Sequence, residues 1–224
     1  IGEIWFEPPP EMLEILVKYL FTSEKLSVQV HPSKDSAIAG EAAKEECWLV
    51  LDAEPGAKLA IGFREEQSRE DVLEAALDGS IEDLLVWHDV KAGDIFYLPA
   101  GTVHAIGPGL PLVEVQQNSD TTFRLYDYGR PRDLHLERAL AVADFRPHAV
   151  KHRSNISQKR ETLVDGAHFR LDRVEGAPDF RMRAHYPAGL LALPLDGELA
   201  LRGGSDPLRA GQCLFAQSID ALDF

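Results

Sequence analysis

Short segments in which hydrophobic and polar residues alternate recur along most of this chain. Between residues 26 and 128 they have the length of β-strands, and Gly, Pro and Asp separate them. Short strands joined by tight turns, rather than strands alternating with helices, indicate an antiparallel sandwich or barrel. We predict strands at Leu26–Val30, Cys47–Leu51, Lys58–Ile61, Val86–Val90, Asp94–Leu98, Val103–Ile106, Pro111–Gln117 and Thr122–Tyr128.

Four other segments predict helices. The first follows three prolines and has hydrophobic residues at helical intervals, and the second is rich in alanine. The third begins with Ser68 and Asp71 in a capping-box pattern, and Gly79 follows it as a terminator. The predicted helices are Glu11–Phe21, Ser33–Glu45, Ser68–Leu77 and Asp133–Asp144.

A polar and charged stretch over residues 146–160 has the composition of a linker. It predicts two units, residues 1–145 and residues 161–224, of which the second is smaller. In the second unit, strand-like pieces resume at His168–Val174, Phe180–Tyr186, Leu190–Pro194, Glu198–Arg202 and Gln212–Gln217.

The composition excludes several classes of protein. The length of 224 residues and a hydrophobic content of 45% are those of a globular protein with a substantial core. No segment is apolar over the length of a membrane span, and neither a secretory signal nor an initiator Met is visible. A formal charge of −14 argues against a nucleic-acid partner. Two cysteines, Cys47 and Cys213, are too few for a disulfide framework, so a reducing cytoplasm is expected.

The segment Leu26–Pro32 carries the first candidate for chemistry. Side chains two apart on a strand share a face, so Gln29 and His31 point the same way, opposite to the valines beside them. Burying two such groups costs free energy unless a partner uses their lone pairs, and a divalent metal is one such partner. The alternative is that solvent or ordinary hydrogen bonds satisfy both side chains.

Glu46 and His104 are further candidates. Glu46 enters an apolar strand, where an inward carboxylate needs a partner, and His104 follows a tight Pro/Gly turn. Together with the first pair they offer nitrogen and oxygen donors without a thiolate, which suits a catalytic zinc or a similar divalent metal. The separations are long and irregular, so spacing alone does not identify a metal site. Cys47 is interpreted as a core residue on the opposite face of the Glu46 strand.

Four blocks of sequence carry these candidates. They are Leu-Ser-Val-Gln-Val-His-Pro from residue 26, Lys-Glu-Glu-Cys-Trp from residue 44, Tyr-Leu-Pro-Ala-Gly-Thr-Val-His-Ala-Ile-Gly from residue 97, and Glu-Val-Gln-Gln-Asn-Ser-Asp-Thr-Thr-Phe-Arg-Leu-Tyr-Asp-Tyr from residue 114. In this order they resemble the type I mannose-6-phosphate isomerases, zinc enzymes with tandem cupin (jelly-roll) domains, and most closely the short bacterial members. The resemblance runs from about Gly2 to Asp144 and is weaker beyond.

The resemblance implies a domain organisation and a metal site. The first unit would be a metal-binding cupin with peripheral helices, and the second a smaller, metal-free, cupin-like domain. One zinc ion per chain would be ligated by His31, Glu46 and His104. Gln29 would be either the fourth ligand or a residue that orients one of the others.

Lys44, Arg124 and Asp120 resemble active-site residues of the family. Lys44 shares a face with Glu46 two residues later, and its family role is substrate binding or proton transfer. Arg124 would place positive charge near a developing oxyanion or the substrate phosphate; the alternative is a surface salt bridge. The base is either Lys44, if its pKa is lowered, or Asp120, which otherwise orients Arg124.

The implied activity is that of a metal-dependent aldose-ketose isomerase. It would interconvert mannose 6-phosphate and fructose 6-phosphate through an enediol intermediate. The expected partner is a hexose 6-phosphate, with no nucleic acid and no membrane, and a monomer is preferred to an oligomer. One alternative is an iron-dependent cupin oxygenase. Another is a catalytically weak or non-catalytic cupin that binds sugar phosphates.

Overall fold

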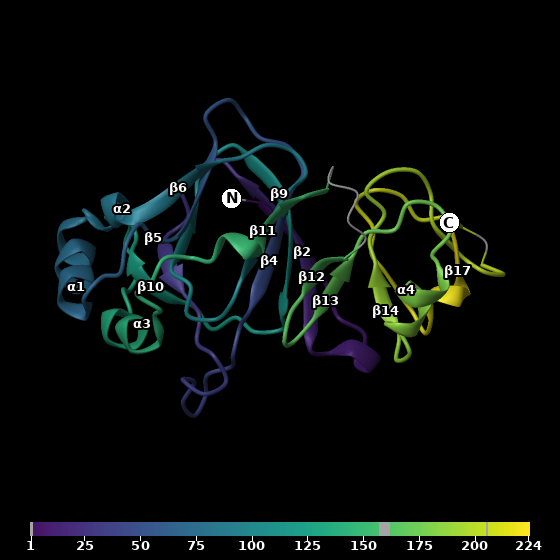
Figure 1. Ribbon diagram of the computed structural model, residues 1–224, viewed down its shortest axis with the longest axis horizontal. Helices are drawn as coiled ribbons and strands as arrows, with labels where there is room; N and C mark the ends of the chain where they lie inside the picture. The colour runs from purple at the N-terminus through teal and green to yellow at the C-terminus, as the bar shows by residue number, and fades with distance from the viewer. Residues whose placement is uncertain (1, 157–161, 205) are drawn as a thin grey trace.

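Two antiparallel sheets face each other and form the larger part of the molecule (Figure 1). The structure is a computed structural model that describes residues 2–156, 162–204 and 206–224. The six-stranded sheet has the order β1 (Gly2–Phe6), β2 (Ile15–Thr22), β9 (Leu110–Gln117), β4 (Glu46–Val50), β7 (Asp94–Leu98) and β11 (Arg153–Asn155). The five-stranded sheet has the order β10 (Phe123–Tyr126), β3 (Val28–Val30), β8 (His104–Ile106), β5 (Lys58–Phe63) and β6 (Leu85–Asp89). Every strand predicted between residues 26 and 128 is present, and the mainly β fold is confirmed.

Three helices pack on the outer face of the five-stranded sheet. The first lies where the sequence predicted it, because the Ser68 side chain accepts the Asp71 N–H and Gly79 ends the helix at a φ of 88°. The third occupies the middle of the predicted helix Asp133–Asp144. In the described part of the chain, no helix combines the length and hydrophobicity that crossing a membrane requires. The three helices are α1 (Arg69–Asp78), α2 (Ile81–Leu84) and α3 (Leu136–Val142).

The predicted helix Glu11–Phe21 is wrong, because most of this segment is strand β2. Only Pro10–Met12 forms a short 3-10 helix, η1, ahead of the strand. Strand β2 lies between β1 and β9 and buries side chains on both of its faces. Such a strand is apolar almost throughout, and hydrophobic periodicity does not distinguish it from a buried helix.

The predicted helix Ser33–Glu45 is also wrong, because this segment forms a loop between β3 and β4. Gly40 adopts a φ of 88°, which a right-handed helix does not allow. At the base of the loop, the Lys44 N–H donates to the Pro32 carbonyl at 3.0 Å. Tertiary contacts therefore override the helix propensity of the alanines.

Part of the predicted linker, residues 146–160, belongs to the six-stranded sheet. It contains the 3-10 helix η2 (Val150–His152) and strand β11, which pairs with β7. His148 packs so closely on Gly62 that a Cβ on this glycine would lie 2.7 Å from the His148 Cβ. Residues 146–156 thus pack against the sandwich, and residues 157–160 lie outside the described residues.

The described residues between 162 and 224 form three two-stranded sheets beside the sandwich (Figure 1). The segment Phe180–Tyr186, predicted as a strand, is instead helix α4 (Phe180–Ala184). It begins where the Asp179 side chain accepts the N–H groups of Arg181 and Met182. The sheets pair β12 (Thr162–Asp165) with β13 (Arg170–Asp172), β14 (Leu190–Ala192) with β16 (Leu214–Ala216), and β15 (Ala200–Leu201) with β17 (Leu222–Asp223), and the 3-10 helix η4 (Ile219–Ala221) precedes β17.

The space between the two large sheets is apolar at one end and polar at the other. At the apolar end, the inward residues of β2, β9 and β4 include Leu20, Leu112 and Val50. Farther along the same strand faces, the inward residues are Lys18, Glu114 and Glu46, which are 8%, 3% and 1% exposed. The alternation of side chains is unchanged along each strand, so the polar end is built from residues that occupy core positions.

Candidate active site

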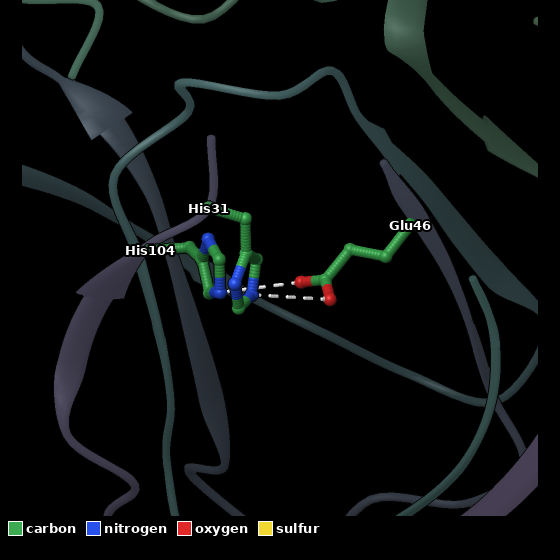
Figure 2. Close-up of side chains that lie close together, drawn as sticks. All are labelled: His31, Glu46 and His104. Atoms are coloured by element: carbon green, nitrogen blue, oxygen red, sulfur yellow. Dashed lines mark ion pairs between the residues drawn. The ribbon is translucent and has the colours of Figure 1, made fainter. Parts of the chain in front are cut away.

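His31, Glu46 and His104 meet at the polar end of the sandwich (Figure 2). One potential ligand atom of each lies within 4.8 Å of those of the other two. Glu46 comes from β4 of one sheet and His104 from β8 of the other, while His31 directly follows β3. The Nε2 atoms of His31 and His104 lie 3.4 and 3.2 Å from the two Glu46 oxygens. The sandwich therefore joins side chains that no short sequence spacing connects.

Both imidazoles direct their Nε2 to the centre, and each holds its other ring nitrogen against a backbone carbonyl. The Nδ1–H of His31 donates to the Thr121 carbonyl at 2.8 Å, and that of His104 donates to the Thr102 carbonyl at 2.9 Å. Burial lowers the pKa of His31 to about 4 and also lowers the pKa of His104. A neutral imidazole fixed in this way directs its Nε2 lone pair inward, as metal-binding histidines do.

Glu46 is a buried carboxylate whose oxygens lack hydrogen bonds. Both of its oxygens and the Nε2 of His31 have no hydrogen-bond partner. Burial alone would raise the pKa of Glu46, but the Lys44 ammonium beside it holds the pKa well below its usual value. Buried polar atoms without hydrogen bonds cost free energy, and the ion pair from Lys44 reaches only one Glu46 oxygen, Oε2, at 3.0 Å. A divalent cation would satisfy two imidazole nitrogens and a carboxylate together. The donor set fits a divalent metal.

Gln29 faces the same centre through its amide nitrogen. Its Nε2 lies 3.2 Å from the Nε2 of His104, its partner in the pairing of β3 with β8. Its oxygen instead accepts a hydrogen bond from the Ser27 hydroxyl at 3.1 Å. In this orientation the carboxamide contacts the imidazole, and a half turn of the amide would direct its oxygen to the centre.

Lys44 and Glu114 extend the buried charges beyond the three candidate ligands. The Nζ of Lys44 lies 3.0 Å from Glu46 Oε2 and 3.3 Å from Glu114 Oε1. Burial alone would lower the pKa of Lys44, but the two carboxylates raise it above its usual value. Among the side chains of the chain itself, attraction to these two carboxylates therefore outweighs the burial of Lys44.

A cavity of about 220 Å³ opens beside these residues, and its wall includes Gln29, Lys44, Asp120 and Arg124. Arg124 lies on β10 opposite Gln29 on β3, and its Nε is buried without a hydrogen-bond partner. Asp120 is exposed at the rim. Among the described ion pairs none joins Asp120 to Arg124, so the expected orienting contact is missing. Four predicted site residues therefore line this cavity, and two of them contact the candidate ligands, Gln29 at His104 and Lys44 at Glu46.

Glu114 and Lys18 belong to this site although the sequence did not reveal them. Lys18 Nζ lies 3.2 Å from Glu114 Oε1 and 4.9 Å from the centre of the Trp5 ring, and all three residues line the cavity. The signal for Glu114 was available, because a carboxylate occupies an inward position of the strand predicted at Pro111–Gln117. Because the segment of β2 was predicted as a helix, the sequence did not show that Lys18 occupies an inward strand position.

Cys47, interpreted as a core residue, and His135, which precedes α3, both have structural roles. Cys47 is buried on the opposite face of β4 from Glu46, in a cluster that includes Val113 and Val115. His135 precedes α3, and its Nδ1 accepts the backbone N–H of Arg124 at 3.2 Å. Neither side chain lines the cavity as described.

Curated relatives of the chain are mannose-6-phosphate isomerases. The protein of that name from Streptococcus mutans is 41% identical over 148 residues, which cover 62% of this chain and 46% of the relative. The mannose-6-phosphate isomerase ManA of Bacillus subtilis is 35% identical over 197 residues, which cover 82% of this chain and 62% of the relative. The chain thus spans about half the length of the curated relatives it matches, from 46% to 62%. No protein-family model matches the chain.

Solved structures of mannose 6-phosphate isomerases share the fold. The crystal structure of the Bacillus subtilis enzyme is 30% identical with a TM-score of 0.75, over 90% of this chain and 68% of that chain. A zinc-bound mannose 6-phosphate isomerase is 18% identical with a TM-score of 0.59, over 93% of this chain and 75% of that chain, and at this identity it supports the fold alone. With its cupin sandwich and these relatives, the chain belongs to the mannose-6-phosphate isomerase family.

Proposed function

We propose that this chain is a metal-dependent aldose-ketose isomerase that interconverts mannose 6-phosphate and fructose 6-phosphate. The observation that carries the proposal is the cavity beside the candidate metal ligands, with Lys44 and Arg124 in its wall. The family relationship supports the same activity, which the names of the relatives state for those proteins.

The metal in this proposal is one zinc ion per chain. His31, Glu46 and His104 would hold it, and Gln29 would either add its oxygen after the amide turns or orient His104. Two imidazole nitrogens and a carboxylate oxygen suit zinc and leave room for substrate in its coordination shell. When bound, the metal supplies Lewis-acid polarisation of the substrate carbonyl.

The residues of the chain would bind the substrate and move one proton. Isomerisation transfers a proton between C1 and C2, and negative charge develops on the carbonyl oxygen. The ammonium of Lys44 and the guanidinium of Arg124 lie in the cavity wall, where aimed charges typically contribute about 3 kcal/mol to the transition state. Lys44, Asp120 and Glu114 are the side chains of this wall placed to transfer the proton.

We further propose that residues 1–145, with strand β11 of the predicted linker added to their sheet, form the metal-binding domain, and that residues 161–224 form a smaller, metal-free, cupin-like domain. All the described buried residues of residues 162–224 are apolar, which supports a second domain without a metal site. Two free cysteines, Cys47 and Cys213, support a reducing cytoplasm. A hexose 6-phosphate is the proposed partner, and a monomer is the proposed oligomeric state.

The direct test uses the purified chain, elemental analysis and conversion of mannose 6-phosphate to fructose 6-phosphate, with and without a chelator. We expect about one zinc ion per chain and an activity that the chelator abolishes and zinc restores. Iron without isomerisation would favour the oxygenase alternative. Zinc without isomerisation would favour a cupin that only binds sugar phosphates.

Variants of the cavity wall test the assigned roles. Arg124→Ala should lower kcat by about 100- to 1,000-fold while zinc content stays unchanged, because a positive charge beside the developing oxyanion is lost. An unchanged kcat would reject this role. Three further variants identify the base: Lys44→Met, Asp120→Asn and Glu114→Gln. The variant that lacks the base should no longer exchange the C2 hydrogen of the substrate with deuterated water.

A further inference from the structure

Arg138 and Glu41 join helix α3 to the loop between β3 and β4. The Nε and Nη2 of Arg138 donate to the two Glu41 oxygens at 2.7 and 2.6 Å, a bidentate geometry. The same Nη2 donates to the Ser36 carbonyl at 3.0 Å. The guanidinium also lies 5.4 Å from the centre of the Phe123 ring on β10. One side chain therefore holds two points of the loop against the rest of the domain.

This loop connects two parts of the candidate site. It leaves the sheet after His31 and returns at Lys44, and its residues 33–45 contain no regular secondary structure (Figure 1). Ordering such a segment costs conformational entropy, so its position depends on specific contacts. Near its end, the Ala42 N–H donates to Thr121 Oγ1 at 3.1 Å, and the Ser119 hydroxyl donates to the Ala42 carbonyl at 3.0 Å.

We propose that Arg138 and Glu41 are positioning residues for the isomerase site. Their ion pair holds the loop so that Lys44 stays within contact of Glu46 and Glu114. Neither Arg138 nor Glu41 belongs to the cavity wall as described, so both act through the loop rather than on the substrate. The inference rests on the proposed function for its kinetic readout and on the loop contacts for its structural readout.

Kinetics of three variants and a matched control test the proposal. Arg138→Gln and Glu41→Gln should each lower kcat on the order of tenfold or more with little change in KM or zinc content, because displacement of a catalytic group slows the chemical step. The double variant should be no slower than either single variant, since all three break the same contact. The control is Arg146→Gln, because Arg146 makes a similar two-point contact with Asp144, at 2.9 and 2.8 Å, outside the loop.

Hydrogen exchange separates this inference from the proposed function. In Arg138→Gln the amides of residues 33–45 should exchange faster, including the Lys44 N–H, while those of α1 and β9 stay protected. This readout holds even if the chain proves inactive as an isomerase. The proposal is overturned if loop exchange is unchanged, or if kcat in Arg138→Gln equals that in Arg146→Gln. Faster exchange over the whole domain, together with loss of zinc, would also overturn the proposal. It would show that the ion pair of Arg138 and Glu41 stabilises the domain in general.

Discussion

The sandwich and the C-terminal region are both built from short strands, yet they bury different kinds of side chain. Between its sheets the sandwich buries Lys44, Glu46 and Glu114 together with two histidines. The described buried residues of the C-terminal region, from Val164 to Leu222, are all apolar. Burying charges costs free energy even when they are paired, so stability alone does not account for such a cluster. The described C-terminal core shows strand packing in which every buried side chain is apolar.

The two regions also differ in how far they depend on each other. Each C-terminal sheet has only two strands, and sheets of this size are marginal without further packing. Part of the region packs on the outer face of the six-stranded sheet, where Val164 and Phe169 join a cluster with Val17 and Tyr19. The remainder has a hydrophobic cluster of its own. The sandwich therefore supports part of the C-terminal region, and the site lies on the opposite side of the same sheet.

The largest expected effect is the loss of metal from the sandwich. His31→Ala or His104→Ala removes one of the three converging ligand atoms, so zinc measured by elemental analysis should fall to near zero. His185→Ala is the matched control, because His185 is an exposed histidine of the C-terminal region. Full zinc retention in both sandwich variants would contradict the prediction, because the histidines of the sandwich would then matter no more for zinc than His185 does.

Truncation of core side chains should have different consequences in the two regions, one losing both stability and zinc, the other stability alone. Phe96→Ala, at a fully buried position between the large sheets, should lower the free energy of unfolding by about 3–5 kcal/mol and weaken zinc retention. Leu199→Ala, in the C-terminal cluster, should cost about 2–5 kcal/mol of local stability and leave zinc in place. Denaturant titrations that follow zinc release and far-ultraviolet circular dichroism provide the measurement. Zinc release at a lower denaturant concentration in Leu199→Ala would show that the regions unfold as one unit.

The smallest effect concerns pH. Burial lowers the pKa of His148 to about 4, whereas an unfolded histidine titrates near pH 6.5. Below about pH 6.5 the unfolded state therefore binds more protons than the native state, so stability falls as the pH drops and the loss levels off near pH 4. The full loss is on the order of 3 kcal/mol. His148→Gln should reduce the difference in unfolding free energy between about pH 7 and pH 5 in urea titrations, and His185→Gln should not; equal differences in all three proteins would contradict this origin.

Much of the sandwich was predictable because strands leave a period of two in the sequence. Strand β7 has the predicted bounds Asp94–Leu98, and the capping residues of α1 were visible directly. Predictions failed where tertiary contacts outweigh local preference. Strand β2 is apolar on both faces, and the loop after β3 is held by Arg138 and other distant residues. Helix α4 begins at the cap formed by the Asp179 side chain, and the strand-like pattern of Phe180–Tyr186 did not indicate this cap.

By itself, the sequence determined the residue types of the site and their assignment to strands, because alternation places Gln29 and His31 on one face and Cys47 opposite Glu46. The resemblance to a family added which of them belong together. Only the tertiary structure decided that His31, Glu46 and His104 converge, that Glu114 and Lys18 join them, and that two carboxylates raise the pKa of Lys44. The reason is physical: these contacts arise where two sheets close over each other, and distances across a sandwich depend on strand order and register rather than on spacing along the chain.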